Sequence, residues 1–326
     1  MKVVIIGGVA GGASAAARIR RLDENAEIII FERSGYISYA NCGLPYYIGG
    51  TIRERDDLTL QTPESFWKRF RVDAKVRHEV TAIHTDRKTV TVRELATDKI
   101  YEESYDKLIL SPGAKPIRPG LPGVDSTKIF TLRTVEDTFR ISEYAGQRSC
   151  RSAVVVGGGF IGVEMAENLR HLGMDVLLVE KQTQLLGQFD SDMASFVHAH
   201  MKAKGVSLLL GKSVKGFEEK DGGIAVNIED GQTITADMAV LAIGVSPDST
   251  LAADAGLKLG LKNSVAVDTH MRTSDPHIYA VGDVAEITNM VTDKKSLISL
   301  AGPANKQGRI AADNICGMQS LSLIHI

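Results

Sequence analysis

Cys42 is the residue whose type and position most directly suggest chemistry. It lies in the segment Ser38-Tyr39-Ala40-Asn41-Cys42-Gly43-Leu44-Pro45-Tyr46, between two glycine-rich turns at residues 7–12 and 157–162. Such turns bind dinucleotide phosphates, and a cysteine thiolate exchanges electrons by forming and breaking disulfides. One thiol between two nucleotide sites predicts that electrons pass from one nucleotide, through a second cofactor, to sulfur. The polar neighbours Ser38 and Asn41 favour this reading over a buried structural cysteine.

The second turn has a complete dinucleotide-binding pattern, Gly157-Gly158-Gly159-Phe160-Ile161-Gly162. Its glycines allow the tight turn, the approach of a pyrophosphate to the backbone, and close packing of helix on strand. Glu180 follows Gly162 by 18 residues, at the end of the next strand pattern. A carboxylate there accepts ribose hydroxyls and repels a 2′-phosphate, so we expect NADH rather than NADPH, a preference that Lys181 weakens. The alternative is a turn that only packs helix on strand.

The first turn is a variant of the same pattern. In Gly7-Gly8-Val9-Ala10-Gly11-Gly12 the middle glycine is replaced by Val9, and Glu32 lies 20 residues beyond Gly12. The position of Glu32, closing an apolar strand pattern, restores the ribose-binding carboxylate. Asp283 follows a further short strand pattern and Gly282, where it could hold a sugar chain or a pyrophosphate. An ordinary βαβ turn and an ordinary turn aspartate are the alternatives.

Each glycine turn belongs to a strand–turn–helix–strand pattern. We expect strands at 2–6 and 27–32 with a helix at 13–22, and strands at 153–156 and 175–180 with a helix at 163–172. This repetition predicts an α/β fold with two Rossmann-like nucleotide-binding domains. Glycine- and proline-containing stretches at 111–123 and 242–247 predict crossings between them. With a last helix expected at 305–315, the second domain is inserted within the first.

The composition excludes several other classes of protein. Of the 326 residues 44% are hydrophobic and 24% charged, and the net charge of −2 offers no basic surface for nucleic acid or an anionic membrane. No apolar run reaches the roughly 18 residues of a membrane span. The three cysteines and the scattered histidines show no metal-ligand spacing, so we expect no metal. A reducing cytoplasm fits the small number of cysteines.

Four motifs in chain order resemble the FAD-dependent pyridine nucleotide–disulfide oxidoreductases: residues 7–12 with Glu32, residues 111–114, residues 157–162, and residues 273–283. The likeness extends to about Gly317 and implies FAD at the first turn and NADH at the second. Residues 300–305 resemble the segment whose following helix points its N-terminus at the flavin ring. The cofactor-binding residues implied by motif and resemblance are Gly7, Gly8, Val9, Ala10, Gly11, Gly12, Glu32, Arg33, Ser111, Pro112, Gly113, Gly157, Gly159, Phe160, Ile161, Gly162, Glu180, Lys181, Gly244, Gly282, Asp283, Pro303, Ala304 and Asn305.

Within that family, the segment around Cys42 looks like the single-cysteine branch of coenzyme A-disulfide reductases and NADH-dependent persulfide reductases. Enzymes of the glutathione reductase type carry a second cysteine five positions after the first, where this chain has Tyr47. The oxidised form of Cys42 must therefore be a mixed disulfide, a persulfide or a sulfenic acid. The resemblance implies catalytic roles for Cys42, Asn41 and Ser38.

The expected acceptor is a small disulfide or persulfide linked to coenzyme A. Ser14, Arg18 and Arg21 are spaced by four and three residues, which places them on one helical face that could grip its phosphates. A solvated basic face is the alternative for the arginines. An NADH oxidase or peroxidase that cycles Cys42 through sulfenic acid is the alternative enzyme. A non-catalytic cofactor-binding fragment is a third possibility.

The expected organisation is an FAD-binding domain at residues 1–115 and 246–320 and an NAD(P)H-binding domain at residues 116–245. Family members continue into a C-terminal dimerisation domain, so we expect the chain to stop before that domain and the full-length protein to be a homodimer. Residues 321–326 read as a translated sequencing-library adapter, and we expect them to be a non-native tail; a natural apolar tail is the alternative.

Overall fold

The computed structural model describes residues 1–322, which fold into two compact α/β units. Unit 1 comprises Met1–Tyr39, Thr59–Lys115 and the described residues from Ser246 onward. Unit 2 comprises Ala40–Leu58 and Pro116–Val245. The strands β10 (Ala114–Pro116) and β19 (Val245–Pro247) contain two of the points at which the chain passes from one unit to the other.

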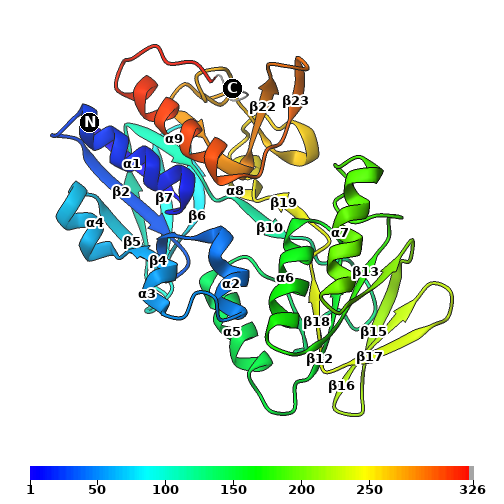
Figure 1. Cartoon of the computed structure of the whole chain (residues 1–326). Coiled ribbons are helices and arrows are strands. Elements are labelled where there is room, and N and C mark those ends of the chain that lie inside the picture. Colours follow the sequence, from blue (N-terminus) through cyan, green and yellow to red (C-terminus); the bar gives the residue numbers. More distant parts are fainter. Residues whose placement is uncertain (323–326) are drawn as a thin grey trace. The chain divides into compact units, whose positions relative to one another are not determined.

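Unit 1 is built on a parallel five-stranded sheet in the order β21-β9-β1-β2-β5. Its central strand is apolar, and Val3, Val4 and Ile5 are fully buried. Helices α1 (Ala10–Leu22) and α9 (Ala301–Ile315) pack against each other. The strands are β1 (Lys2–Ile6), β2 (Glu27–Glu32), β5 (Asp73–Val76), β9 (Lys107–Leu110) and β21 (Ile278–Ala280). Figure 1 labels β2 and β5 of this sheet, together with the helices α1 and α9 of the same unit.

Smaller elements complete unit 1. An antiparallel sheet contains β6 (His78–His84), β7 (Thr89–Glu94) and β8 (Ile100–Ser104), and a second, two-stranded sheet contains β3 (Ile37–Tyr39) and β4 (Thr59–Gln61). A third sheet contains β20 (Val265–Ala266), β22 (Ala285–Asn289) and β23 (Lys294–Ser296). The unit also has the helices α4 (Pro63–Phe70) and α8 (Thr250–Asp254) and the 3₁₀ turns η2 (Leu261–Asn263) and η3 (Gly282–Val284). Helix α4 begins where a capping box joins Thr62 and Ser65.

Unit 2 repeats the plan with a parallel five-stranded sheet in the order β11-β18-β12-β13-β14. Its strands are β11 (Ile129–Phe130), β12 (Ser152–Val156), β13 (Asp175–Glu180), β14 (Val206–Leu210) and β18 (Met238–Leu241). The helices are α5 (Val135–Ala145), α6 (Phe160–His171) and α7 (Ser191–Ala203). An antiparallel sheet of β15 (Val214–Lys220), β16 (Gly223–Ile228) and β17 (Thr233–Ala236) adds to its core.

The segment Ala40–Leu58 corrects the predicted domain division, because it belongs to unit 2 although the sequence placed it with residues 1–115. It contains η1 (Asn41–Gly43), α2 (Leu44–Ile48) and α3 (Arg55–Leu58). The Tyr47 ring packs on Phe139 of α5 at 5.4 Å between centroids, and the Arg55 guanidinium lies 4.3 Å from the same ring. The segment therefore groups with unit 2 because of its contacts with α5, a helix that is distant from it in the sequence.

Two further differences concern element ends. Helices α1 and α6 begin at Ala10 and Phe160, three residues before the predicted starts, and α9 begins at Ala301, four residues early. In all three the helix starts inside the motif itself. No helix within the described residues combines the length and apolar character that crossing a bilayer requires.

Candidate functional site

The glycine turn of unit 1 is held by Glu32. Its carboxylate accepts the backbone N–H of Gly8 at 2.8 Å through Oε2 and that of Ser34 at 2.9 Å through Oε1. Gly7 has a φ of +95°, and a Cβ at this position would lie 2.1 Å from the carbonyl oxygen of Ser111. A side chain is excluded there both by conformation and by space. Glu32 therefore does more than the sequence suggested, because it also fixes the turn.

The start of α1 offers free backbone donors. The N-cap residue is Val9, whose apolar side chain cannot accept a hydrogen bond from the first N–H groups of the helix. No acidic residue lies in the first turn. A Cβ at Gly12 would come within 1.9 Å of the carbonyl oxygen of Gly7, so helix and turn are in backbone contact. Gly11 similarly faces Ser111, with 2.8 Å from a built Cβ to its Oγ. Exposed N–H groups and the helix dipole together suit a phosphate group.

The predicted Gly282–Asp283 motif lies in the same unit. Gly282 has a φ of +79°, and its N–H donates to Oε1 of the buried Gln307 on α9 at 2.5 Å. Asp283 follows in η3 and is half-buried. The first turns of α9 contain Pro303, Ala304 and Asn305. Asn305 accepts the Ser14 hydroxyl at 2.9 Å, so a predicted cofactor residue and a predicted substrate residue are joined.

Among the other predicted cofactor residues of unit 1, Arg33 is exposed, and Ser111, Pro112 and Gly113 are half-buried. Arg33 pairs with Asp248 at 3.1 Å. Ser111 donates its backbone N–H to the carbonyl of Ile6 at 2.7 Å, and Gly113 has a φ of +76°. Pro112 stands between them in a half-buried stretch. The 111–113 segment thus continues from the end of β9 beside the glycine turn.

The glycine turn of unit 2 has the same arrangement. Gly158 donates to Oε2 of Glu180 at 2.5 Å, and Gln182 donates to Oε1 at 2.7 Å. Gly157 has a φ of +112°, and a Cβ there would lie 2.4 Å from the carbonyl oxygen of Ala242. Gly159, the N-cap of α6, has no atom within 4 Å of a built Cβ apart from those of its immediate chain neighbours. The protein therefore leaves space beside Gly159, where the pattern expects a pyrophosphate to approach.

Aromatic side chains border this second turn. Phe160, at the start of α6, is about half exposed, and its ring meets Phe189 edge-on at 6.2 Å between centroids. Lys181 is exposed next to Glu180.

Gly244 has a φ of +118° and accepts the N–H of Ile117 at 3.0 Å. Ile161 lies one residue before Gly162, whose built Cβ would approach the Gly157 oxygen to 1.9 Å.

Cys42 is an exposed free thiol in η1 of unit 2, followed directly by α2. Asn41 precedes it in the same turn and is half-buried. Burial raises the pKa of Tyr46, with further contributions from Glu164 and Glu167 of α6 and from Cys42 itself. Burial also raises the pKa of Glu164, and Glu167 adds to that shift. Two acidic side chains and a phenol are thus grouped on this side of α2, a set that the sequence reasoning missed.

The other two cysteines have different surroundings. Cys150 is buried, and burial followed by the charge of Asp237 raises its pKa to about 11. Cys316 follows α9, and burial also raises its pKa, with Asp23 and Asp313 contributing. All three cysteines are unpaired. A raised pKa lowers the thiolate fraction at neutral pH, so Cys150 and Cys316 are poor nucleophiles and Cys42 is the accessible thiol.

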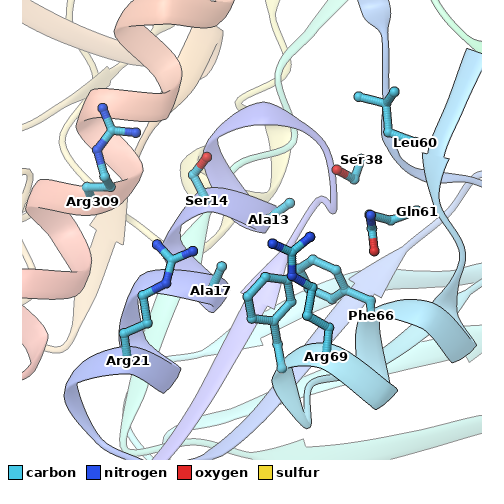
Figure 2. A pocket seen from close by; sticks show the side chains of 11 residues that line it. Ala13, Ser14, Ala17, Arg21, Ser38, Leu60, Gln61, Phe66, Arg69 and Arg309 are labelled. Atoms are coloured by element: carbon cyan, nitrogen blue, oxygen red, sulfur yellow. The ribbon is translucent and has the colours of Figure 1, made fainter.

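A cavity of about 300 Å³ in unit 1 is bordered by arginines (Figure 2). Arg21 comes from α1, Arg69 from α4 and Arg309 from α9, and Ser14 and Ser38 add hydroxyls. The guanidinium groups of Arg21 and Arg69 lie 5.8 and 5.1 Å from the centroid of the Phe70 ring. Within the described residues, no carboxylate pairs with any of these three arginines, so their charges are uncompensated. Such a cavity suits an anion.

Arg18, the third predicted substrate residue, lies outside this cavity. Its Nε donates to Oδ1 of Asp313 at 2.7 Å, and it borders a second cavity together with Lys306 and Arg309. Arg18 and Arg21 share a helix face but only Arg21 is without an acidic partner. The sequence did not indicate Arg69 and Arg309 as substrate residues, because they lie on α4 and α9 and not on the helix that carries Ser14, Arg18 and Arg21. Within residues 1–322 no group of three or more histidine, cysteine or acidic side chains is placed to hold a metal ion.

The tail predicted at residues 321–326 is described only in part. Leu321 borders the second cavity, and Ser322 donates its N–H to the carbonyl of Thr269 at 2.7 Å. Residues 323–326 lie outside the described residues.

A family model described as pyridine nucleotide-disulphide oxidoreductase matches residues 1–308, which include both glycine turns, Cys42 and Asp283. The chain belongs to this family. The predicted family, α/β fold and oxidoreductase class are thereby confirmed, and so, at the level of the family, is the pairing of FAD with a pyridine nucleotide.

Individual relatives give narrower names. An NADH oxidase of Methanocaldococcus jannaschii is 36% identical over 322 residues, covering 98% of this chain and 71% of the relative. A coenzyme A disulfide reductase of Staphylococcus aureus is 34% identical over 320 residues, covering 98% and 72%. Both an oxidase and a disulfide reductase are thus among the curated relatives.

Two solved structures are similar over 98% of this chain with a TM-score of 0.95. Reduced CoADR-RHD of Bacillus anthracis is 51% identical, and an NAD-dependent persulfide reductase of A. fulgidus is 38% identical. This chain spans 57% of the first structure and 60% of the second.

Proposed function

We propose that this chain carries the nucleotide-binding and thiol parts of an NADH-dependent flavoenzyme that reduces coenzyme A disulfide or a coenzyme A persulfide or polysulfide. The observation that carries the proposal is the cavity bordered by three arginines that have no acidic partner among residues 1–322, a cavity whose wall includes Ser38. Ser38 precedes Cys42 by four residues. Even a fully extended chain holds two such residues within about 14 Å of each other.

The chemistry of this cavity fits coenzyme A better than a small disulfide. Coenzyme A combines several phosphates with an adenine ring and ends in a long arm that bears sulfur. The arginines and the hydroxyls of Ser14 and Ser38 suit the phosphates. Ala13, Phe66 and Phe70 provide an apolar floor for a ring. The names of the relatives support the same acceptor.

The two glycine turns are assigned within the same proposal. Unit 1 binds FAD through its turn, Glu32 and Asp283, and unit 2 binds NADH through its turn and Glu180. When bound, FAD takes two electrons from NADH and makes them available to sulfur. The residues present fit these groups, because each turn opens a helix whose first N–H groups suit a phosphate and each carboxylate lies against its turn, where the motif expects a ribose. A cytoplasmic location belongs to the proposal, since the cycle needs a reduced thiol. A homodimeric full-length protein belongs to it as well, as the family resemblance implies.

The step at Cys42 is disulfide exchange. The Cys42 thiolate attacks one sulfur of coenzyme A disulfide, the S–S bond breaks, and one coenzyme A thiolate leaves. Two electrons supplied by NADH then cleave the mixed disulfide, which regenerates the Cys42 thiolate and releases the second coenzyme A. With a persulfide acceptor the terminal sulfur leaves as hydrosulfide. Tyr47, at the position of a second cysteine, packs on Phe139 and cannot form an internal disulfide.

Comparing acceptors tests this assignment. We expect anaerobic NADH consumption with coenzyme A disulfide or persulfide to be at least about tenfold faster than consumption with O₂ alone. Equal rates with O₂ would favour the NADH oxidase, the alternative to which the Methanocaldococcus relative points. FAD absorbance without turnover by any acceptor would identify a non-catalytic cofactor-binding chain.

The arginine cavity leads to a prediction about KM. Removing one uncompensated guanidinium by Arg21→Ala or Arg309→Ala should raise the KM for coenzyme A disulfide by about tenfold, the equivalent of one charge-assisted hydrogen bond. Steady-state kinetics at low ionic strength measures the effect. An uncharged aromatic disulfide without phosphates should keep its KM in both variants.

Arg87→Ala is the matched control, because Arg87 is an exposed arginine that pairs with Glu102 at 2.9 Å and is not among the residues that line the cavity. We expect its KM values to equal those of the unmodified protein. If the three variants behave alike, or if the KM of the aromatic disulfide rises as well, the cavity does not select for phosphates.

A second prediction concerns the choice between NADH and NADPH. Glu180→Gln removes the negative charge that repels a 2′-phosphate and keeps one oxygen for the N–H of Gly158, while its NH₂ group can no longer accept the N–H of Gln182. The preference between the two nucleotides, rather than the affinity for either, therefore reports the effect of the charge. The ratio of kcat/KM for NADH over NADPH should fall by about tenfold, which corresponds to about 1.4 kcal/mol. An unchanged ratio would show that the carboxylate charge does not set the preference.

A further inference from the structure

His198 of α7 accepts a hydrogen bond from the main chain of the loop between β13 and α7. The N–H of Leu185 donates to its Nε2 at 3.0 Å. A backbone N–H can only donate, so Nε2 is unprotonated here and a neutral ring carries its proton on Nδ1. The side chain of Leu185 is fully buried. Among the hydrogen bonds of the described residues, His198 supplies the acceptor for this N–H.

The loop held in this way, residues 182–189, touches the glycine turn of unit 2 at several points. Leu186 donates its N–H to the carbonyl oxygen of Gly158 at 2.8 Å. The Leu185 side chain covers Gly158 so closely that a Cβ there would lie 2.6 Å from its Cδ2. Gln182 donates to Glu180, and Phe189 meets the ring of Phe160. The position of the turn and of Glu180 therefore depends on this loop.

The surroundings of His198 favour its neutral form. Burial of the half-buried ring lowers its pKa, and the charge of Lys202, one turn further along α7, lowers it too. The loop residues 182–189 contain no titratable side chain, and neither does β14, the strand on which α7 packs. Asp190 and Asp192 lie more than a turn before His198, at the N-terminal end of the helix. No carboxylate on these elements is placed to stabilise a protonated ring.

We propose that His198 is a positioning residue of the nicotinamide-nucleotide site: its neutral ring holds the 182–189 loop against the glycine turn, and protonation of the ring loosens the loop and weakens NADH binding. A protonated Nε2 carries a hydrogen, so it faces the Leu185 N–H as a second donor and that N–H loses its acceptor. The proposal rests on the assignment of NADH to unit 2. It adds that the affinity for NADH falls as the pH falls through the pKa of His198.

The sign follows from linkage. NADH binds best to the state with a neutral ring, so binding lowers the pKa of His198 further and releases a proton near that pKa. Linkage to one proton changes the dissociation constant by at most about tenfold per pH unit. Since burial and Lys202 lower the pKa of His198 from its ordinary value of 6.5, we expect the dissociation constant for NADH to stay level down to about pH 6.5 and to rise at lower pH, approaching about tenfold per pH unit once the pH is below that pKa.

The test uses His198→Gln, since a glutamine amide oxygen can accept the same N–H and does not titrate in this range. Binding of NADH is measured calorimetrically across pH, in two buffers of different ionisation enthalpy, which also counts the protons released. His198→Gln should reduce the pH dependence to within about twofold and abolish the proton release. His200→Gln, an exposed histidine on the same helix, is the matched control and should behave like the unmodified protein.

The outcomes separate this inference from the proposed function. Absence of NADH binding at every pH would contradict the assignment of unit 2. Normal binding at pH 7.5 with the same pH dependence in the unmodified protein and in His198→Gln would overturn the role of His198 alone. Should His198→Gln fail to fold, the proton count on the unmodified protein still decides, because an absence of proton release below about pH 6.5 contradicts the linkage.

Discussion

Cys42→Ser should lower the rate of coenzyme A disulfide reduction by about a thousandfold or more while NADH still reduces the bound FAD at an unchanged rate. The serine hydroxyl is a far weaker nucleophile than a thiolate at neutral pH and cannot form a disulfide, so the step at sulfur is lost. The glycine turns assigned to the first half-reaction are residues 7–12 and 157–162, and Cys42 belongs to neither. Anaerobic stopped-flow absorbance separates the two half-reactions, since flavin bleaching reports the first and release of coenzyme A thiol the second.

Cys316→Ser is the control for this experiment, because burial and nearby carboxylates raise the pKa of that thiol and leave it a poor nucleophile. We expect normal disulfide reduction in this variant. If Cys42→Ser still reduced coenzyme A disulfide at the normal rate, the electrons would have to leave the protein at another site, and the role of Cys42 would be wrong.

Gly159→Ala should raise the dissociation constant for NADH by at least about tenfold without lowering the melting temperature. The backbone at Gly159 is extended, with a φ of −75°, and no atom beyond those of its immediate chain neighbours lies within 4 Å of a built Cβ, so the protein itself tolerates alanine. The methyl group instead occupies the space through which a pyrophosphate approaches the turn. Calorimetric NADH titration and thermal unfolding, carried out on the same sample, measure the two effects.

Gly162→Ala provides the contrast. Its Cβ would lie 1.9 Å from the carbonyl oxygen of Gly157, so this variant should unfold at a lower temperature whether or not NADH is present. A Gly159→Ala protein that binds NADH normally would mean that the nucleotide does not pass over the open glycine. Loss of stability in Gly159→Ala would mean that the space is filled by the protein.

The local features of both nucleotide sites could be predicted from the sequence, because they depend on spacing within one βαβ unit. Glu32 and Glu180 follow their glycine turns by 20 and 18 residues, and each ends the strand next to the turn. Parallel pairing of β1 with β2 and of β12 with β13 brings each carboxylate to the turn. The spacing did not reveal that each carboxylate also binds the backbone N–H of the turn, since that depends on side-chain geometry.

The arginine cavity could not be predicted in the same way. Arg21, Arg69 and Arg309 lie on three helices separated by long stretches of sequence, and only packing of α1 with α9 and α4 brings them together. Arg18 shows the limit of helical spacing, because it shares a face with Arg21 but pairs with Asp313. Likewise the segment Ala40–Leu58 belongs to unit 2 through contacts with Phe139 and Asn168, far along the chain.

The chemical state of Cys42 after reaction with its acceptor tests the central claim most directly. Protein with Cys42 as a free thiol and its bound FAD oxidised is mixed anaerobically, in the absence of NADH, with one equivalent of coenzyme A disulfide, quenched with an alkylating reagent, digested, and examined by mass spectrometry. The account predicts that the peptide containing Cys42 carries one coenzyme A as a mixed disulfide, and that adding NADH before the quench removes it. A Cys42 peptide that is only alkylated, or oxidised to sulfenic acid, while coenzyme A disulfide is consumed would contradict the account.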